Sequence, residues 1–138
     1  MSAKDKFHGI VKSALERDRW TITDDPLRIE WGLVEVYIDL GAEKIIGAEK
    51  EGQKIAVEVK SFLAQSTISE FHTALGQFIN YRFVLSQEQP ERILYLAVPL
   101  DTYNTFFTLP FTQAITQENK LRLLIYDVQR EEIFQWIN

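Results

Sequence analysis

The chain has 138 residues, a mass of 16.1 kDa and an ordinary globular composition, with 46% hydrophobic and 25% charged residues. These values predict one domain over residues 1–138, and the absence of cysteine excludes a disulfide scaffold and a cysteine nucleophile. The net charge of −5 disfavours a non-specific nucleic-acid coat, but leaves a nuclease open, because a bound divalent cation offsets negative charge locally. Without a signal peptide or a long apolar run, we expect a soluble, cytoplasmic protein that makes no membrane contact.

The first half of the chain predicts one helix followed by short strands. Apolar side chains recur at helical spacing over about residues 3–18, which predicts an amphipathic helix. Residues 20–23 alternate like a short strand, and Asp24-Asp25-Pro26 is typical of a turn. Three more strands are expected, with a hairpin turn at Glu51-Gly52-Gln53 before the last of them: about 34–40, 44–50 and 54–62.

The second half predicts a long helix, a buried strand and several short elements. Residues 66–85 have helical periodicity, and residues 92–98 are almost continuously apolar, as in a strand that is covered on both faces. The order helix, strands, helix, strand favours an α/β fold in which helices cover both faces of a central mixed sheet. Short helices and then short strands are expected in the rest of the chain: 101–107, 110–117, 121–126 and 133–136.

One group of charged residues forms a candidate catalytic site. Glu58 and Lys60 are two positions apart on a predicted strand, so their side chains share one face of the sheet. The hairpin can bring Asp39 close to Glu58, and two converging carboxylates suit Mg²⁺ or Mn²⁺. A neighbouring lysine can orient the attacking water. Two alternatives remain, because Glu49 could supply the other carboxylate and a solvated strand face also alternates charged residues with valine.

The pattern Asp39…Glu58-x-Lys60, on a strand hairpin after an N-terminal helix, resembles the active-site signature of the PD-(D/E)xK nuclease superfamily. The segment Gln77-Phe-Ile-Asn-Tyr81 is similar to the Q-x-x-x-Y motif of its RecB-like members. This resemblance implies a restriction-endonuclease-like core of αβββαβ order. It also implies a metal held by Asp39 and Glu58, with catalytic or substrate contacts from Lys60, Gln77 and Tyr81.

Some positions fit this resemblance less closely. Ile38 stands where these nucleases customarily carry a proline, and Glu16 is the only carboxylate deep in the first helix that could complete the site. His8 and Lys12 are one helical turn apart and could meet a phosphate, or could belong to a solvated face.

Six segments spread over nearly the whole chain form a second pattern: Lys4-Asp-Lys-Phe-His8, Trp20-Thr-Ile-Thr-Asp-Asp-Pro-Leu27, Asp39-Leu-Gly-Ala-Glu-Lys44, Ile55-Ala-Val-Glu-Val-Lys-Ser-Phe62, Ala74-Leu-Gly-Gln77 and Tyr95-Leu-Ala-Val-Pro99. They resemble the XisH family, cyanobacterial proteins named as fdxN element excision controlling factors. The resemblance implies a part in the programmed removal of a DNA element during heterocyst differentiation. It also implies two partners, a site-specific recombinase and a protein called XisI.

Two functions fit the sequence. The first is a Mg²⁺-dependent DNA endonuclease, and the second is a non-catalytic interaction protein in an excision complex. We also expect a homodimer whose catalytic pockets remain open to solvent. The C-terminal elements contain more large apolar residues than one sheet edge should need to bury, among them Phe107, Phe111 and Trp136, and some of these could form a two-fold interface.

Overall fold

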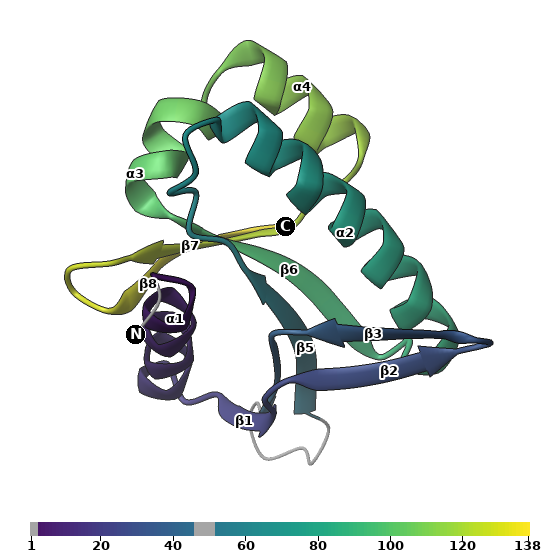
Figure 1. Ribbon diagram of the computed structural model, residues 1–138. Helices are drawn as coiled ribbons and strands as arrows, with labels where there is room; N and C mark the ends of the chain where they lie inside the picture. The colour runs from purple at the N-terminus through teal and green to yellow at the C-terminus, as the bar shows by residue number, and fades with distance from the viewer. Residues whose placement is uncertain (1–2, 46–51) are drawn as a thin grey trace.

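The computed structural model describes residues 3–45 and 52–138, and it confirms a mixed α/β fold whose central sheet has helices on both faces (Figure 1). No helix in the described ranges is long and apolar enough to cross a membrane. The helices are α1 (Ala3–Arg17), α2 (Thr67–Glu88), α3 (Leu100–Thr102), the π-helix η1 (Tyr103–Phe107) and α4 (Pro110–Glu118). The strands are β1 (Thr21–Asp24), β2 (Leu27–Trp31), β3 (Val34–Ile38), β4 (Leu40–Ile45), β5 (Gly52–Val59), β6 (Arg92–Pro99), β7 (Leu123–Asp127) and β8 (Glu132–Ile137).

The main sheet has six strands in the order β1-β4-β5-β6-β7-β8, and β2 and β3 form a separate two-stranded sheet. The central strands β5, β6 and β7 run parallel, while the outer pairs are antiparallel. Parallel neighbours need a long crossover, and α2 supplies it between β5 and β6. Along the chain, three strands of the main sheet lie between α1 and α2, namely β1, β4 and β5.

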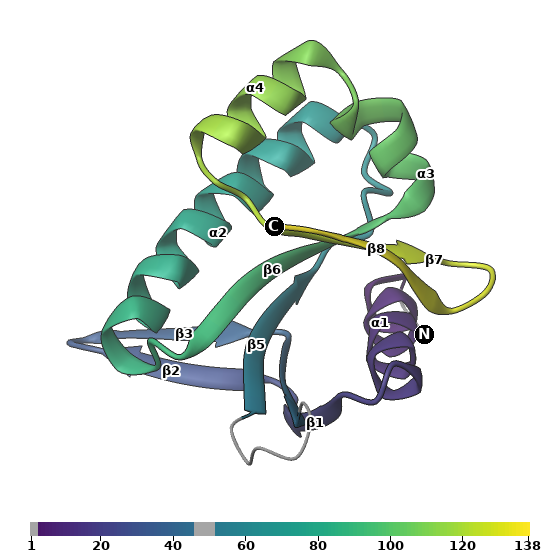
Figure 2. The same ribbon diagram turned by 180° about the vertical axis from the view of Figure 1, so that it is seen from behind.

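Each face of the sheet packs against its own set of helices (Figures 1 and 2). On β5, Ile55 and Val57 join the apolar cluster that contains α1, whereas Ala56 joins the cluster that contains α2. Because strand side chains alternate between faces, Glu58 points to the α2 side. The side chains of Ile55 and Val57 therefore face α1, whereas those of Ala56 and Glu58 face α2.

The hairpin formed by β2 and β3 was not predicted from the sequence. Leu27 and Ile29 of β2 are buried, and the indole of Trp31 lies edge-on to Phe83 of α2 with ring centroids 5.0 Å apart. The turn uses Gly32, whose φ of 62° favours glycine. A usable signal was present, since Leu27, Ile29 and Trp31 alternate with charged residues directly before this glycine.

Three predicted strand boundaries were wrong. The strand expected over 34–40 is divided at Asp39 into β3 and β4, which belong to different sheets. The strand expected over 54–62 ends at Val59, and Phe62 has a φ of 54°, which is incompatible with a continuing strand. Gly52 begins β5 instead of occupying the turn. Most of the strand expected over 44–50 lies outside the described residues, and its first two residues end β4.

The C-terminal aromatic residues are less exposed than the sequence-based dimer surface requires. Phe107 is fully buried, and Trp136 packs against Tyr95 and Trp20 with ring centroids 4.8 and 5.8 Å away. Phe111 and Phe134 remain about half exposed. Part of the expected surface therefore belongs to the core, and the homodimer itself stays a prediction.

The side chain of Arg92 connects three strands of the main sheet. Its guanidinium donates hydrogen bonds to Asp24 on β1 at 3.1 Å and to the carbonyl of Ile55 on β5 at 2.9 Å. This guanidinium is nearly buried, with 7% of the side chain exposed. A Cβ added at Gly41 would lie 2.9 Å from the Asp24 carboxylate and 3.1 Å from the Arg92 guanidinium, so a larger residue at this position would force the ion pair to shift.

We expect Arg92→Met to lower the free energy of unfolding by about 2 kcal/mol, because it removes the cation that pairs with Asp24 and a donor to the Ile55 carbonyl, and leaves Asp24 with the hydroxyl of Thr23. Urea unfolding measures the effect. Arg130→Met is the matched control, since that side chain is 77% exposed and its ion pair with Glu132 is long, at 3.9 Å. Its effect should stay within about 0.5 kcal/mol, and equal losses in the two variants would contradict the role of Arg92.

Candidate functional site

Asp39 lies at the bend between β3 and β4, next to the end of β5. Its backbone N–H donates to Oε1 of Glu58 at 3.2 Å, and its own Oδ2 accepts from the backbone N–H of Val59 at 2.8 Å. These two bonds hold the side chains of Asp39 and Glu58 beside each other. The predicted approach of the two carboxylates is therefore present in the structure.

Lys60 follows the last residue of β5, and its backbone is fixed on both sides. Its N–H donates to the carbonyl of Ala97 at 3.0 Å, and its carbonyl accepts from the hydroxyl of Tyr126 at 2.9 Å. The ammonium nitrogen lies 3.6 Å from Oε2 of Glu58, and 17% of the lysine side chain is exposed. Lys60 thus reaches the carboxylate pair from just beyond the strand.

Tyr81 lies near the pair, on the face of α2 that packs against the sheet. Burial, and then the charges of Glu58 and Asp39, raise the pKa of Tyr81 to about 12. Gln77 is one helical turn earlier, and its Oε1 is buried without a hydrogen-bond partner among the described residues. Neither side chain donates a hydrogen bond to the carboxylates in the described part of the chain, so the geometry associates Tyr81 with the pair more closely than Gln77.

Glu70 has a structural role at this site that the sequence did not reveal. Its carboxylate accepts hydrogen bonds from the backbone N–H groups of Phe62 at 3.0 Å and Ala64 at 3.2 Å. These bonds fix the loop that leads away from Lys60. A small cavity of about 180 Å³ lies beside this loop, lined by Phe7, Val59, Lys60, Ser61 and Glu70.

Other candidate residues lie elsewhere. Glu16 is exposed on α1, which covers the face of the sheet opposite to Glu58. His8 and Lys12 both contact the carboxylate of Asp25, at 2.7 and 2.9 Å, so they hold the turn before β2. Glu49 lies outside the described residues.

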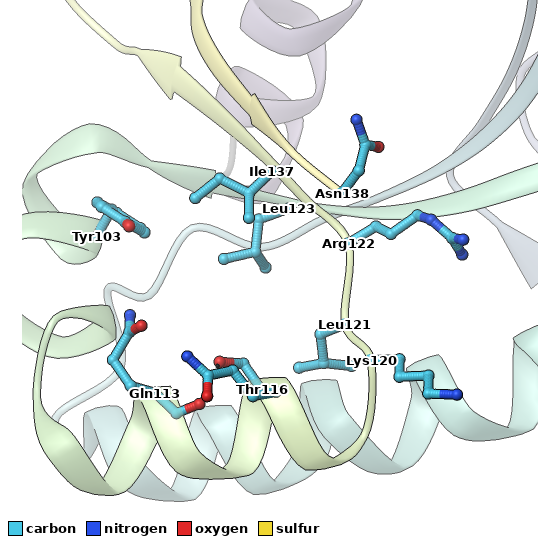
Figure 3. A pocket seen from close by; sticks show the side chains of 10 residues that line it. Tyr103, Gln113, Thr116, Lys120, Leu121, Arg122, Leu123, Ile137 and Asn138 are labelled. Carbon is cyan, nitrogen blue, oxygen red and sulfur yellow. Dashed lines mark hydrogen bonds between the residues drawn. The ribbon is translucent and has the colours of Figure 1, made fainter.

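A larger cavity of about 490 Å³ lies away from the carboxylate pair (Figure 3). Gln113 and Thr116 of α4 face Leu123 and Ile137 across it. Leu123 of β7 is in register with Leu96 of β6, which in turn is in register with Glu58 of β5. The cavity wall at Leu123 therefore lies two strands away from Glu58, at the same level along the strands, and neither Asp39 nor Glu58 lines the cavity.

Glu58 is a nearly buried carboxylate, with 7% of the residue exposed. Burial, and next the negative charge of Asp39, raise the pKa of Glu58 to about 7 from an ordinary 4.5, while the charge of Lys60 opposes the shift. At about pH 7 roughly half of the molecules therefore carry a proton on Glu58. A divalent cation that displaces this proton would restore the full charge of the pair.

The donor set fits Mg²⁺ or Mn²⁺. Each carboxylate uses one oxygen to accept a backbone N–H, which leaves Oδ1 of Asp39 and Oε2 of Glu58 for a ligand. The described residues contain no cluster of three or more acidic, histidine or cysteine side chains that could enclose a metal. Two carboxylates with water at the remaining positions is a common arrangement for Mg²⁺.

The raised pKa of Glu58 predicts a pH-dependent stability. Its pKa is higher in the folded chain than in the unfolded one, so its contribution to the free energy of unfolding is largest below about pH 4.5. This contribution falls by up to about 3 kcal/mol as the pH rises to 7. Glu58→Gln cannot ionise and should be more stable than the wild type at about pH 8. Urea unfolding between about pH 5 and 8 tests this, with exposed Glu43→Gln as control, and parallel curves for wild type and Glu58→Gln would contradict it.

These features define a mixed α/β protein in which a nearly buried glutamate, a half-buried aspartate and an adjacent lysine meet at the end of an interior strand. The XisH family model, described as XisH protein, matches residues 1–134, and the chain therefore belongs to the XisH family. A solved XisH family protein from Nostoc punctiforme is 60% identical, with a TM-score of 0.89, covering 97% of this chain and 100% of that one. A solved fdxN element excision controlling factor protein from Anabaena variabilis is 59% identical, with a TM-score of 0.88, covering 97% of this chain and 99% of that one. No curated protein matches the chain.

Proposed function

We propose that this chain is a Mg²⁺- or Mn²⁺-dependent DNA endonuclease of the PD-(D/E)xK type that acts in the excision of a DNA element. The observation that carries the proposal is the placement of Asp39, Glu58 and Lys60. A nearly buried carboxylate lies against a second carboxylate and 3.6 Å from an ammonium group. Burying two like charges together is costly unless a ligand or a proton compensates, so a purely structural role gives no reason for the pair.

The element order supports a restriction-endonuclease-like core. Along the chain, α1 precedes three strands of the main sheet, and α2 and then β6 follow. This is the αβββαβ order that the resemblance implies, with β2 and β3 inserted as a separate hairpin. The carboxylate pair lies at the end of β5, directly after the antiparallel pair β4–β5.

The chemistry proposed for the pair is phosphodiester hydrolysis. Asp39 and Glu58 would hold the cation, which when bound supplies a Lewis acid for a phosphate oxygen and lowers the pKa of bound water. Hydrolysis forms a bond from the water oxygen to phosphorus and breaks one phosphorus–oxygen bond of the DNA backbone. Lys60 is placed to orient the attacking water and to offset the charge that develops on the phosphate. Tyr81 and Gln77 would line the pocket on the α2 side.

The relatives supply the biological setting of this proposal. The protein from Anabaena variabilis is named an fdxN element excision controlling factor, and we extend a role in excision control to this chain. The partners implied by the family, an XisI-like protein and a site-specific recombinase, would bring the acidic chain to its DNA. Non-specific attraction to DNA is weak for a net charge of −5.

Metal binding should raise the melting temperature. Millimolar Mn²⁺ that binds only the folded state should stabilise it by about 1–3 kcal/mol, which corresponds to several degrees for a chain of this size. The shift should disappear in Glu58→Ala and persist in Glu43→Ala, whose carboxylate is exposed. Differential scanning fluorimetry with and without chelator measures it. The same shift in Glu58→Ala as in the wild type would exclude this metal site.

Nicking of supercoiled plasmid DNA tests the activity itself. Lys60→Ala should reduce the Mg²⁺- or Mn²⁺-dependent nicking rate by at least about a hundredfold, because it removes the cation beside the reacting phosphate. Lys54→Ala is the matched control, since Lys54 lies on the same strand but is 40% exposed and pairs with Glu43. Equal rates for Lys60→Ala and wild type would assign any observed nicking to a contaminant.

The acidic charge and an exposed apolar surface, described below, favour the second function, a non-catalytic interaction protein in an excision complex. Under that function the wild type gives no metal-dependent nicking, alone or with its partners. The two measurements above therefore separate an active nuclease from a nuclease-like fold that retains only metal binding.

A further inference from the structure

One continuous surface of large apolar side chains is exposed on the described chain, at the tip of the β2–β3 hairpin and the neighbouring side of α2. We call it the hairpin surface, and its residues and exposed fractions are Trp31 42%, Leu33 107%, Val34 57%, Ile79 41% and Phe83 48%.

The residues of the hairpin surface are contiguous. Trp31 and Val34 are directly opposite each other across the hairpin, and Leu33 is the turn residue between them. The ring of Trp31 contacts the ring of Phe83 at 5.0 Å. Ile79 is one helical turn before Phe83, so their side chains are neighbours on α2. The hairpin tip lies beside the C-terminal half of α2 in both views (Figures 1 and 2).

The area of this surface is large for a chain of this size. Together the five side chains expose about as much area as three whole large side chains, roughly 600 Å². The largest apolar patch of a monomeric protein is typically about 300–600 Å². Two such surfaces in contact would bury roughly 1,200 Å², which reaches the lower bound of a specific protein–protein interface.

The charges around the hairpin indicate which occupant fits. None of the five residues is charged, and Arg28 is already paired with Glu35 at 2.9 Å on the opposite face of the hairpin. A DNA backbone would require unpaired cations, which the surface does not offer. A neutral surface can meet a copy of itself without like-charge repulsion, and a two-fold contact requires such self-complementarity.

We propose that the hairpin surface is the contact between two copies of this chain. Leu33 and Trp31 of one copy would pack against the same residues and Phe83 of the other. The contact is distinct from the C-terminal surface expected from the sequence, in which Phe107 is fully buried and Trp136 packs against Trp20 and Tyr95. It leaves the carboxylate pair free, because Asp39 lies at the other end of β3 from the hairpin tip.

Sedimentation velocity over micromolar concentrations tests this proposal with Leu33→Asp. We expect a dimeric wild type and a rise of at least about a hundredfold in the dissociation constant of the variant, because each contact loses two buried leucines. The matched control is Phe134→Asp, which places the same charge at a side chain that is 58% exposed on the edge strand β8. It should leave the dimer intact.

A second measurement uses the absence of cysteine from the chain. Leu33→Cys introduces a single thiol, and a short bismaleimide should then give a covalent dimer, whereas Phe134→Cys should not. Unchanged melting temperatures show that the variants remain folded. A monomeric wild type, a dimer that survives Leu33→Asp, or a dimer lost in Phe134→Asp would each overturn the proposal. If the hairpin surface binds only a different protein, the wild type will sediment as a monomer.

Discussion

The exchange of hydrogen bonds between Asp39 and the end of β5 is the contact on which the rest of this site depends. The backbone N–H of Asp39 donates to Glu58, and the side chain of Asp39 accepts from Val59. The same two bonds attach the start of β4 to the main sheet after the chain leaves the separate hairpin. The hydrogen bonds that attach the start of β4 to β5 therefore also bring the two carboxylates together.

This contact places opposing demands on Glu58. The side chain is fixed by a backbone donor, but it is also buried beside a second carboxylate, which raises its pKa. Lys60 compensates only in part, because its ammonium lies 3.6 Å from the nearest oxygen of Glu58. A proton on Glu58, or the proposed cation, would complete the compensation, and this requirement distinguishes the pair from the exposed ion pairs elsewhere on the chain.

Much of the fold could be predicted because its signals are local. The apolar stripe of α1 and the continuous apolar run of β6 follow directly from side-chain periodicity. The convergence of Glu58 and Lys60 followed from their spacing, although Lys60 lies just beyond the strand. The approach of Asp39 to Glu58 was predicted from a strand hairpin, and the structure forms it by pairing β4 with β5, although the strand boundaries differ from those expected.

The remaining features depend on tertiary contacts. The end of β5 is set by the left-handed conformation of Phe62 and by the carboxylate of Glu70, eight residues further along the chain. The burial of Phe107 depends on rings from α2 and from the loop after β5, which sequence reasoning could not place beside it. The division at Asp39 is invisible in the sequence, because the apolar residues on either side continue the alternation of a single strand.

The hydroxyl of Tyr126 has a consequence for the C-terminal third of the chain. This buried group on β7 donates to the carbonyl of Lys60, so β7 helps to position a lysine that lies more than sixty residues earlier. A shortened chain that ends after α4 would keep every predicted site residue and still lack the support of that lysine. Motif content alone is therefore a poor guide to function among shortened or frame-shifted relatives of this protein.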